Sequence, residues 1–546
     1  MSPAVRQFRR LADHYLEEHW KLFPQEASEH GLHAFDDQLG ENDADTWQRS
    51  IRLMGETLAA VEALPDSAFA ADDWLDRRGF LALLRSELFF TDRFPRWRMN
   101  PQAHVDVALE SILLLLIRNA DRLERVRPAV ERRLAQLPRF LAQGAACLRA
   151  PVPIWTRLAR KTCAGAESFL NDVAVQLAPI SREPETTRRL ARDAIAAFAQ
   201  FAETAARHDP SPANAYAIGR QQFEMLIRER TGLPYSLPEV QALGEDLVHR
   251  LRAELDGEAR KFGRKKASQI LEAAAERWAE EQTKTARGSL LDQYRRLTVH
   301  VRERFERAEV VTFPKGEHCR VLLVPVFLRH HFPTAAYLSP GAFDRDQTGI
   351  FWVNDLSLEH TNPAQKAAEI RQHFGLEFTC AHEAYPGHHL QFAIQNRHPS
   401  KLRRLFHHAI FYEGWTLWCE KLSVEQRVID FPEARLIQLH DALWRAHRIV
   451  IDCGLHEGSL SYAAACRRLR EGVGFTAARA RGDVNWYTSS PTVPMSYLLG
   501  RLEVERLHAH CVTQEGWSLR RFHDWLLSFG AIPWSWIWQC GLRPKL

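Results

Sequence analysis

The segment HEAYPGHH, residues 382–389, contains residue types that could bind a metal ion and activate a water molecule. In the pattern H-E-x-x-H, two histidines one helical turn apart bind zinc and the glutamate acts as a base. Here Pro386 stands where the second histidine belongs, and His388 and His389 follow it. A regular helix would place His388 about 120° around its axis from His382, and His389 about 10.5 Å further along it. A straight helix therefore cannot bring either pair to one ion.

Pro386 and Gly387 make a straight helix unfavourable, because proline removes a backbone hydrogen bond and glycine tolerates unusual dihedral angles. A two-residue bulge over residues 385–387 would bring His388 to the place of the second histidine. His388 is therefore the first candidate for this ligand, and His389 is the second. The alternative is a surface turn with a chance cluster of histidines in a chain that has 25 of them.

The segment RRLFHHAIFYEGWTLWCEKLSVEQ, residues 403–426, supplies a candidate third ligand. Its helical pattern is apolar nearly all round, yet Glu413 and Glu420 fall on one core-facing stripe. A buried carboxylate is unfavourable unless it is paired or bound to metal. Glu413 precedes Gly414, which permits close approach of another element, so it suits a zinc ligand. Glu420 suits an acceptor for a ligand histidine. The alternative is two carboxylates that pair with arginines inside a helical bundle.

The segment WRAHRIVIDCGLH, residues 444–456, places Arg448, Asp452 and His456 four residues apart on one helical face. This spacing fits either an ordinary ion pair on a helix or three residues that face a substrate.

Two tyrosines, Tyr487 and Tyr497, lie in WYTSSPTVPMSYLLG, residues 486–500. The prolines there fix the entry into a final helix. A tyrosine hydroxyl in this place could stabilise an oxyanion, and a tyrosine of the core is the alternative.

Most of the remaining sequence has the apolar spacing of helices. We expect helices over residues 1–20, 45–65, 73–91, 121–149, 182–207, 237–285, 289–308, 434–456, 461–481 and 493–512, with interrupted helical pattern from 363 to 428. Short β-branched and aromatic runs between about 319 and 354 predict a small β-ribbon just before the histidine motif. The expected fold is mainly α, with an N-terminal helical region, 1–230, and a catalytic region, 231–546, in one continuous structural unit.

Composition and charge argue against some classes of protein. The formal charge is +4, from 72 basic and 68 acidic residues that are interleaved along the chain, which argues against a nucleic-acid-binding protein. The nine cysteines include no C-x-x-C, so we expect buried free thiols in a reducing compartment. The N-terminus has no apolar signal-peptide region, and the run ILLLLI at 112–117 is too short to cross a bilayer. These features predict a cytoplasmic protein with no membrane partner.

Taken together, these segments resemble the bacterial family known as domain of unknown function 885. Its motifs H-E-x-x-P-G-H-H, E-G-W, D-x-G-L-H and S-Y-x-x-G correspond in order to HEAYPGHH, YEGWTLWCE, DCGLH and SYLLG. The segments 23–33 (FPQEASEHGLH) and 97–101 (WRMNP) resemble its N-terminal signatures. One departure is Val493, where the family usually carries glutamine. The family in turn resembles, at a distance, the neurolysin-like and Taq-type carboxypeptidase zinc peptidases (gluzincins), whose folds are mostly helical with a deep channel.

The resemblance implies that His382, His388 and Glu413 bind one Zn²⁺ per chain. It also implies that Glu383 is the general base and that Tyr497 donates to the oxyanion. We further expect His456 among the catalytic residues. The remaining candidates, expected to support the ligands or contact the substrate, are His389, Glu420, Arg448, Asp452 and Tyr487.

The function expected from these features is zinc-dependent hydrolysis of a peptide or amide bond in a short peptide. Two rival hypotheses stay open. One is a non-catalytic helical scaffold with a structural metal site, which would use four protein ligands. The other is a metal hydrolase that acts on a non-peptide amide or ester.

Overall fold

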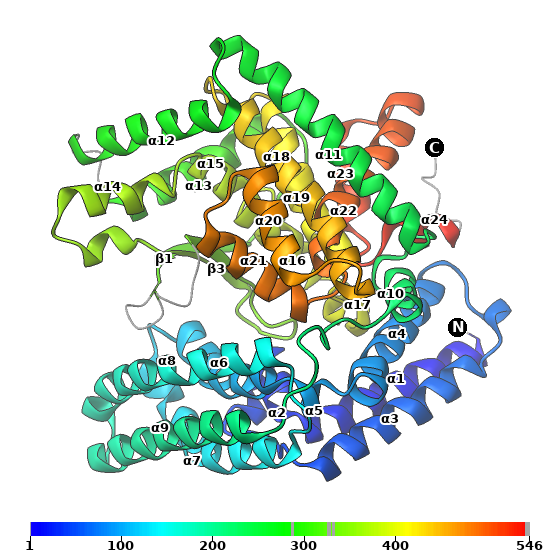
Figure 1. Ribbon diagram of the computed structural model, residues 1–546. Coiled ribbons are helices and arrows are strands. Elements are labelled where there is room, and N and C mark those ends of the chain that lie inside the picture. Colours follow the sequence, from blue (N-terminus) through cyan, green and yellow to red (C-terminus); the bar gives the residue numbers. More distant parts are fainter. Residues whose placement is uncertain (1, 285–288, 325–328, 330–333, 541–546) are drawn as a thin grey trace. The chain divides into compact units, whose positions relative to one another are not determined.

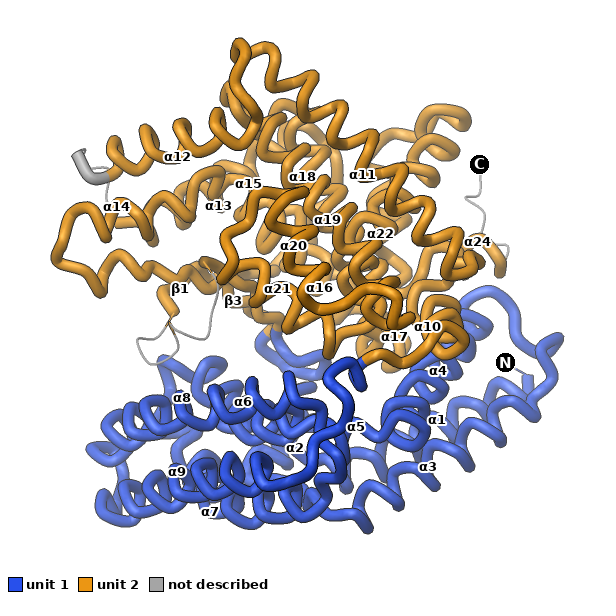
Figure 2. Tube along the Cα trace, viewed as in Figure 1, with its two compact units in different colours: residues 1–216, 340–346 blue, residues 217–339, 347–546 orange. Residues whose placement is uncertain are grey.

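The computed structural model describes residues 2–284, 289–324, 329 and 334–540, and most of them are helical (Figure 1). The expectation of a mainly α fold with a small β-ribbon is confirmed. The chain forms two compact units, residues 1–216 with 340–346 and residues 217–339 with 347–546 (Figure 2). The expected boundary at 230/231 falls inside unit 2, within the π-helical turn Ile227–Thr231.

Unit 1 is a set of packed helices. The first shows why they form: Ser2 accepts a hydrogen bond from the amide of Val5, proline occupies the first helical position, and the apolar side chains of one face are buried. Residues 340–346 join this unit, where the amide of Phe343 donates to the carbonyl of His30. The α-helices of unit 1 are α1 Pro3–Leu22, α2 Pro24–Glu29, α3 Ala44–Glu62, α4 Ala71–Leu88, α5 Arg96–Met99, α6 Pro101–Arg118, α7 Leu123–Cys147, α8 Pro153–Leu177 and α9 Pro184–Arg207.

Unit 2 contains the histidine motif. In Figure 1 the yellow helix α18 lies among α15, α19 and α22, and it packs against all three. The helices and strands of unit 2 are α10 Arg220–Leu226, α11 Leu237–Ala259, α12 Ala267–Lys284, α13 Leu290–Arg307, β1 His318–Leu323, β2 Ala335–Leu338, β3 Thr348–Val353, α14 Pro363–Arg371, α15 Leu376–Glu383, α16 His388–Gln395, α17 Lys401–Leu405, α18 Ala409–Glu425, α19 Ala434–Glu457, α20 Tyr462–Val473, α21 Ala477–Ser489, α22 Val493–His508, α23 Leu519–Leu527 and α24 Trp534–Gln539.

The sheet has the strand order β1-β3-β2, with β1 parallel and β2 antiparallel to the central β3. Its central strand is almost entirely buried. The edge strand β2 lies against α15 and therefore borders the histidine motif.

Side-chain caps begin two of the helices of unit 2. Ser236 and Glu239 form a capping box at the start of α11, and Asn362 caps α14 with Pro363 at its first position. A single helix over 237–285 is wrong, because Gly263, at φ +104°, separates α11 from α12. The expected helix 461–481 is likewise divided, at Gly474, into α20 and α21. Helices α6 and α8 are not among those predicted.

All nine cysteines are free, and six of them are buried, as expected. In the part of the chain that the structure describes, no helix combines the length and the apolar character needed to cross a membrane.

Candidate metal centre

The histidine motif is divided between two short helices. Helix α15 ends at Glu383 and α16 begins at His388, so residues 384–387 form a longer break than the predicted two-residue bulge. An added Cβ at Gly387 would overlap the backbone oxygen of His382, so the turn requires glycine here. Trp415 of α18, which is fully buried, fixes the turn by donating from Nε1 to the carbonyl oxygen of Pro386 at 2.8 Å.

This break brings His382 and His388 together with Glu413. Nε2 of His382 lies 3.8 Å from Oε2 of Glu413, and Nε2 of His388 lies 3.7 Å from the same oxygen. One ligand atom from each residue lies within 4.8 Å of the other two. Two atoms that each bind one zinc ion at about 2.0–2.2 Å cannot lie more than about 4.4 Å apart. Both pairs with Glu413 satisfy this limit, so each histidine lies close enough to share an ion with that carboxylate.

Two buried polar atoms of this cluster lack hydrogen-bond partners. Oε2 of Glu413 and Nδ1 of His388 are buried, and neither has a hydrogen bond to any described residue. Burial lowers the pKa of His388 well below its usual value, helped by the nearby His382 and His407, which keeps the ring neutral as a ligand must be. Burial raises the pKa of the Glu413 carboxyl, although His382 and the hydroxyl of Tyr497 oppose it. A buried carboxylate oxygen without a donor is costly and is what a cation would relieve.

Glu420 lies where an acceptor for a ligand histidine is needed. Its Oε1 is 2.8 Å from Nδ1 of His382, which leaves Nε2 of that ring directed at Glu413. Burial disfavours the charged ring of His382, but the hydrogen bond to Glu420 and the surrounding carboxylates prevail and raise its pKa. Such a partner fixes both the tautomer and the orientation of a ligand histidine.

His389 belongs to a different set of contacts. It has no exposed surface, its Nε2 lies 2.6 Å from Oε2 of Glu317, and its Nδ1 lies 3.1 Å from the hydroxyl of Tyr337. The same oxygen of Glu317 accepts from the hydroxyl of Tyr385, and Arg302 pairs with its other oxygen at 2.9 Å. The two adjacent histidines therefore point into separate polar clusters.

Glu383 follows His382 and lines a cavity of about 710 Å³. Burial raises the pKa of Glu383 to about 7, helped by Glu413 and opposed by His382. The backbone of Tyr337 on the edge strand β2 also opposes this rise in pKa. The cavity is also lined by His382 and Glu420, by the beginning of β2, and by residues of α12, α19 and α21.

Tyr497 reaches the cluster through a close helix crossing. An added Cβ at Gly414 of α18 would lie 2.6 Å from the Cα of Gly500 on α22, so only glycines allow this approach. The prediction that Gly414 permits close approach is confirmed, and the element that approaches is α22. Tyr497 is on that helix, and its hydroxyl acts on Glu413 by opposing the burial that raises the pKa of that carboxyl.

Asp452 and His456 lie away from the metal candidates. Both have no exposed surface; Asp452 accepts from the amides of Thr492 and Met495 and so fixes the start of α22. His456 contacts the carbonyl of Tyr487 at 3.0 Å through Nε2. The predicted catalytic role of His456 finds no support in this packing, because a side chain sealed in the core cannot reach a substrate.

Arg448 and Tyr487 are near the site without touching the three candidate ligands. The guanidinium of Arg448 lies 4.6 Å from the ring of Tyr497, and its Nε donates to the hydroxyl of Tyr487 at 3.0 Å. That hydroxyl in turn donates to Asp483 at 2.6 Å. Both of its hydrogen-bonding directions are therefore in use.

The structure adds residues that the sequence does not single out. Glu317 directly precedes β1 and Tyr337 lies in β2, and neither strand has a motif of its own. Arg445 lies three residues before Arg448 in the apolar helix α19. The only sequence signal for them is a charged residue in a segment that is otherwise apolar or extended.

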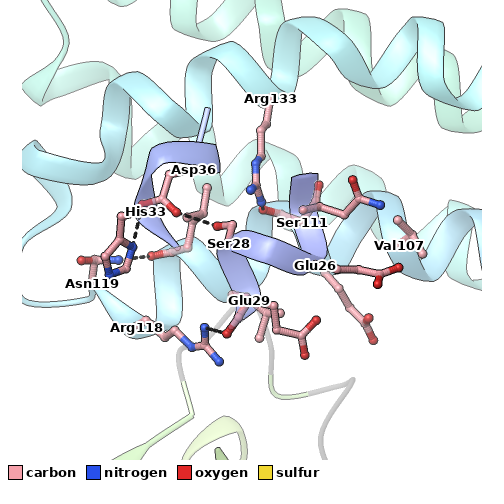
Figure 3. A pocket seen from close by; sticks show the side chains of 14 residues that line it. Glu26, Ser28, Glu29, His33, Asp36, Val107, Ser111, Arg118, Asn119 and Arg133 are labelled. Carbon is pink, nitrogen blue, oxygen red and sulfur yellow. Dashed lines mark hydrogen bonds and ion pairs between the residues drawn. The ribbon is translucent and has the colours of Figure 1, made fainter. Parts of the chain in front are cut away.

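Unit 1 contains a small polar pocket of about 70 Å³ between α2, α6 and α7 (Figure 3). Its side chains are largely engaged with one another: Ser28 donates to Asp36 at 2.6 Å, and Asp36 also pairs with His33 at 3.0 Å. Arg133 donates to the carbonyl of Ser111. Its size suits a few water molecules rather than a substrate.

The chain matches one protein family and is similar in fold to solved structures. The family described as "Bacterial protein of unknown function (DUF885)" matches residues 24–539. The chain is similar to the "putative lipoprotein of unknown function" from Shewanella oneidensis, with a TM-score of 0.75, 19% identity, and coverage of 98% of this chain and 100% of that one. It is also similar to the "putative lipoprotein" from Colwellia psychrerythraea, with a TM-score of 0.76, 17% identity and 98% of each chain covered. At these identities the similarity shows the fold alone. A comparison with curated proteins finds no match.

Proposed function

This chain belongs to the DUF885 family, and from that premise we propose that it is a zinc-dependent hydrolase of peptide or amide bonds in short peptides. The observation that carries the proposal is the convergence of Nε2 of His382, Nε2 of His388 and Oε2 of Glu413 at a place where that oxygen has no hydrogen-bond donor. Two imidazoles and one carboxylate are a frequent ligand set of catalytic zinc.

A zinc ion held by these residues would supply a Lewis acid that polarises a carbonyl and makes water more acidic. The carboxylate of Glu383, which lines the adjoining cavity, accepts a proton from that water and passes it to the leaving nitrogen. The hydroxyl of Tyr497, held beside Glu413, donates to the oxyanion that develops on the substrate.

The number of candidate ligands supports a catalytic rather than a structural metal. Structural zinc sites have four protein ligands, whereas catalytic sites keep a position free. Among the described residues the cluster contains three such groups, and the adjacent histidine in the sequence, His389, is already paired with Glu317. A cavity of about 710 Å³ next to the cluster has the size of a site for a small ligand.

The test combines metal analysis with a peptide-library digest. We expect about one zinc per chain in the purified protein and cleavage of short peptides. Glu383→Gln should reduce turnover about 10²–10⁴-fold, since it removes a base, while zinc content stays unchanged.

Glu377→Gln is the matched control, because Glu377 lies on the same helix, α15, but does not line the cavity. It should leave both turnover and zinc content unchanged. Loss of zinc in Glu383→Gln would instead make that residue a ligand, and a wild-type protein without affinity for zinc would refute the proposal. Esters and non-peptide amides in the same screen distinguish the other hydrolase class.

A further inference from the structure

The cavity that Glu383 lines has a second chemical feature, a group of arginines around Trp444. The guanidinium carbon of Arg445 lies 4.0 Å from the centre of the Trp444 ring, that of Arg448 also 4.0 Å, and that of Arg479 5.0 Å. Arg479 also lies 3.9 Å over the ring of Phe475. Aromatic rings hold guanidinium groups in place without neutralising them.

These arginines lack the close carboxylate partners that buried arginines usually have. A two-pronged pair of arginine with a carboxylate has N–O distances of about 2.7–2.9 Å. The carboxylate nearest to Arg445 is that of Asp441, at 3.5 Å, and the nearest to Arg448 is that of Asp483, at 3.9 Å. The guanidinium of Arg479 contacts the rings of Trp444 and Phe475, and the carboxylates of Asp441 and Asp483 act on it by charge alone.

Two of the unused donors are buried. Nε of Arg445 and Nη1 of Arg448 have no hydrogen-bond partner in the described part of the chain, and both residues are more than nine-tenths buried. The nearby acids are already engaged: Asp483 accepts from Trp444 and Tyr487, and Glu420 accepts from His382. Asp441, which lines the same cavity, adds a third carboxylate, so the group is distinguished by its N–H donors without hydrogen-bond partners rather than by its net charge.

The arginines and the candidate metal centre share one cavity. His382, Glu383, Arg445 and Arg479 all line it. Arg445 lies 3.9 Å from Oε1 of Glu420, which is bonded to His382, so the two groups are separated by one side chain. The cavity wall also includes apolar side chains, those of Phe374, Phe378, Ile437 and Phe475.

We propose that Arg445 and Arg479, with the added charge of Arg448, form a subsite for a carboxylate of the substrate. This inference rests on the proposed function and narrows it to peptides that carry a carboxylate close to the cleaved bond. Two sources share this chemistry, the free C-terminus of a peptide and the side chain of an aspartate or glutamate. The apolar wall beside the arginines suits a C-terminal residue with an apolar side chain.

The test uses the zinc-loaded full chain with Glu383→Gln, so that binding is measured without cleavage. Three tripeptide libraries serve as probes: one with free C-termini, one with the same sequences as C-terminal amides, and one of amides with an internal aspartate or glutamate. Equilibrium dialysis with mass spectrometry gives the affinities. We expect the free acids to bind at least about 10-fold more tightly than the amides, since hydrogen bonds between an arginine and a carboxylate are stronger than those to a neutral amide.

Arg479→Ala is the decisive variant, because its side chain is exposed at the cavity and lies outside the candidate metal centre. It should reduce the preference for acids to about 1 without changing zinc content or thermal stability. Arg481→Ala, two positions along the same helix and outside the cavity lining, is the matched control and should keep the preference. Arg479→Lys should keep only part of it, because lysine lacks the planar fork.

The outcomes separate this subsite from the proposed hydrolase. Equal binding of acids and amides, or an acid preference that survives Arg479→Ala, overturns the subsite, and cleavage by the wild type then still supports the hydrolase. An acid preference without any cleavage by the zinc-loaded wild type supports the subsite and refutes the hydrolase. A preference for the internal acidic residue assigns the subsite to a side-chain carboxylate. Absence of binding by all three libraries overturns the subsite.

Discussion

His388 and His389 are adjacent in the sequence, yet they belong to two clusters of opposite character. Around His389 the ring and Glu317 are both engaged: one oxygen of Glu317 contacts His389 and accepts from Tyr385, its other oxygen forms an ion pair with Arg302, and Tyr337 contacts the other ring nitrogen of His389. Around His388 the polar groups are not all engaged, since its Nδ1 and the nearest oxygen of Glu413 are buried without hydrogen-bond partners. Both ring nitrogens of His389 have protein partners, whereas Nδ1 of His388 and Oε2 of Glu413 have none among the described residues.

The difference separates a structural role from a binding role. Buried polar groups in folded proteins are nearly always satisfied, so a satisfied cluster contributes to the fold and needs nothing further. An unsatisfied carboxylate surrounded by ring nitrogens at 3.7–3.8 Å is unfavourable until a cation occupies the space between them. We infer that the His389 cluster stabilises the turn at residues 384–387. The His388 cluster is the one that we expect to bind the metal.

The largest expected effect separates the two histidines directly. His388→Ala removes one of three candidate ligands, and its loss of zinc affinity should exceed the roughly 10–100-fold typical of outer partners. His389→Ala should leave zinc bound. The measurement is zinc stoichiometry at equal chelator strength in the two variants.

His407→Ala is the control for removal of a histidine in the same region, because His407 stacks on Phe392 and lies outside the cluster of candidate ligands. It should keep its zinc. If His389→Ala lost the metal and His388→Ala kept it, the comparison between the two clusters would be inverted and the later histidine would be the ligand.

The second prediction concerns the cluster around His389. Glu317→Ala leaves His389, Tyr385 and Arg302 without their shared acceptor, and removal of one partner from a buried pair costs about 3–5 kcal/mol. The free energy of unfolding should fall by about that amount in a denaturant titration. Zinc affinity, measured on the folded protein, should change by much less than in His388→Ala.

Glu317→Gln serves as the conservative variant. Glutamine keeps one oxygen that can accept a hydrogen bond, so it should recover part of the stability that alanine loses. A large loss of zinc in Glu317→Ala with unchanged stability would show that this cluster acts on the metal rather than on the fold.

Sequence reasoning predicts the fold class and the approximate limits of several long helices because apolar spacing and caps are local signals. Ser236 with Glu239, and Asn362 with Pro363, begin helices where their local chemistry indicates. The single long helix over 237–285 is wrong because one glycine in an otherwise helical pattern is a weak signal. The structure resolves it as a break at Gly263, with φ +104°.

Local signals also decide which parts of the candidate site can be predicted from the sequence. The grouping of His388 with Glu413 follows from helix geometry and from a carboxylate in an apolar helix. The partners of His389 could not be predicted, because Glu317 lies 72 residues away and Tyr337 lies 52 residues away in the sequence. The position of Arg479 beside Trp444 depends on the packing of α21 against α19, which no local pattern encodes.

The smallest expected effect concerns Glu420, which contacts the candidate ligand His382 and is not itself a candidate ligand. Glu420 accepts from Nδ1 of His382 and so directs Nε2 of that ring toward Glu413. Loss of such an orienting partner typically costs about 10–100-fold in metal affinity. Glu420→Ala should therefore weaken zinc binding by about that factor, measured by competition with a chelator.

Glu420→Gln sharpens the same comparison. Its amide oxygen can still accept the hydrogen bond from His382, so most of the zinc affinity should be retained if orientation is the main effect. Glu413→Ala provides the reference for loss of a ligand. If Glu420→Ala weakened zinc binding as strongly as Glu413→Ala, then Glu420 would be a ligand itself. If it had no effect, His382 would be held by its packing alone, and the hydrogen bond at 2.8 Å would contribute nothing to the affinity.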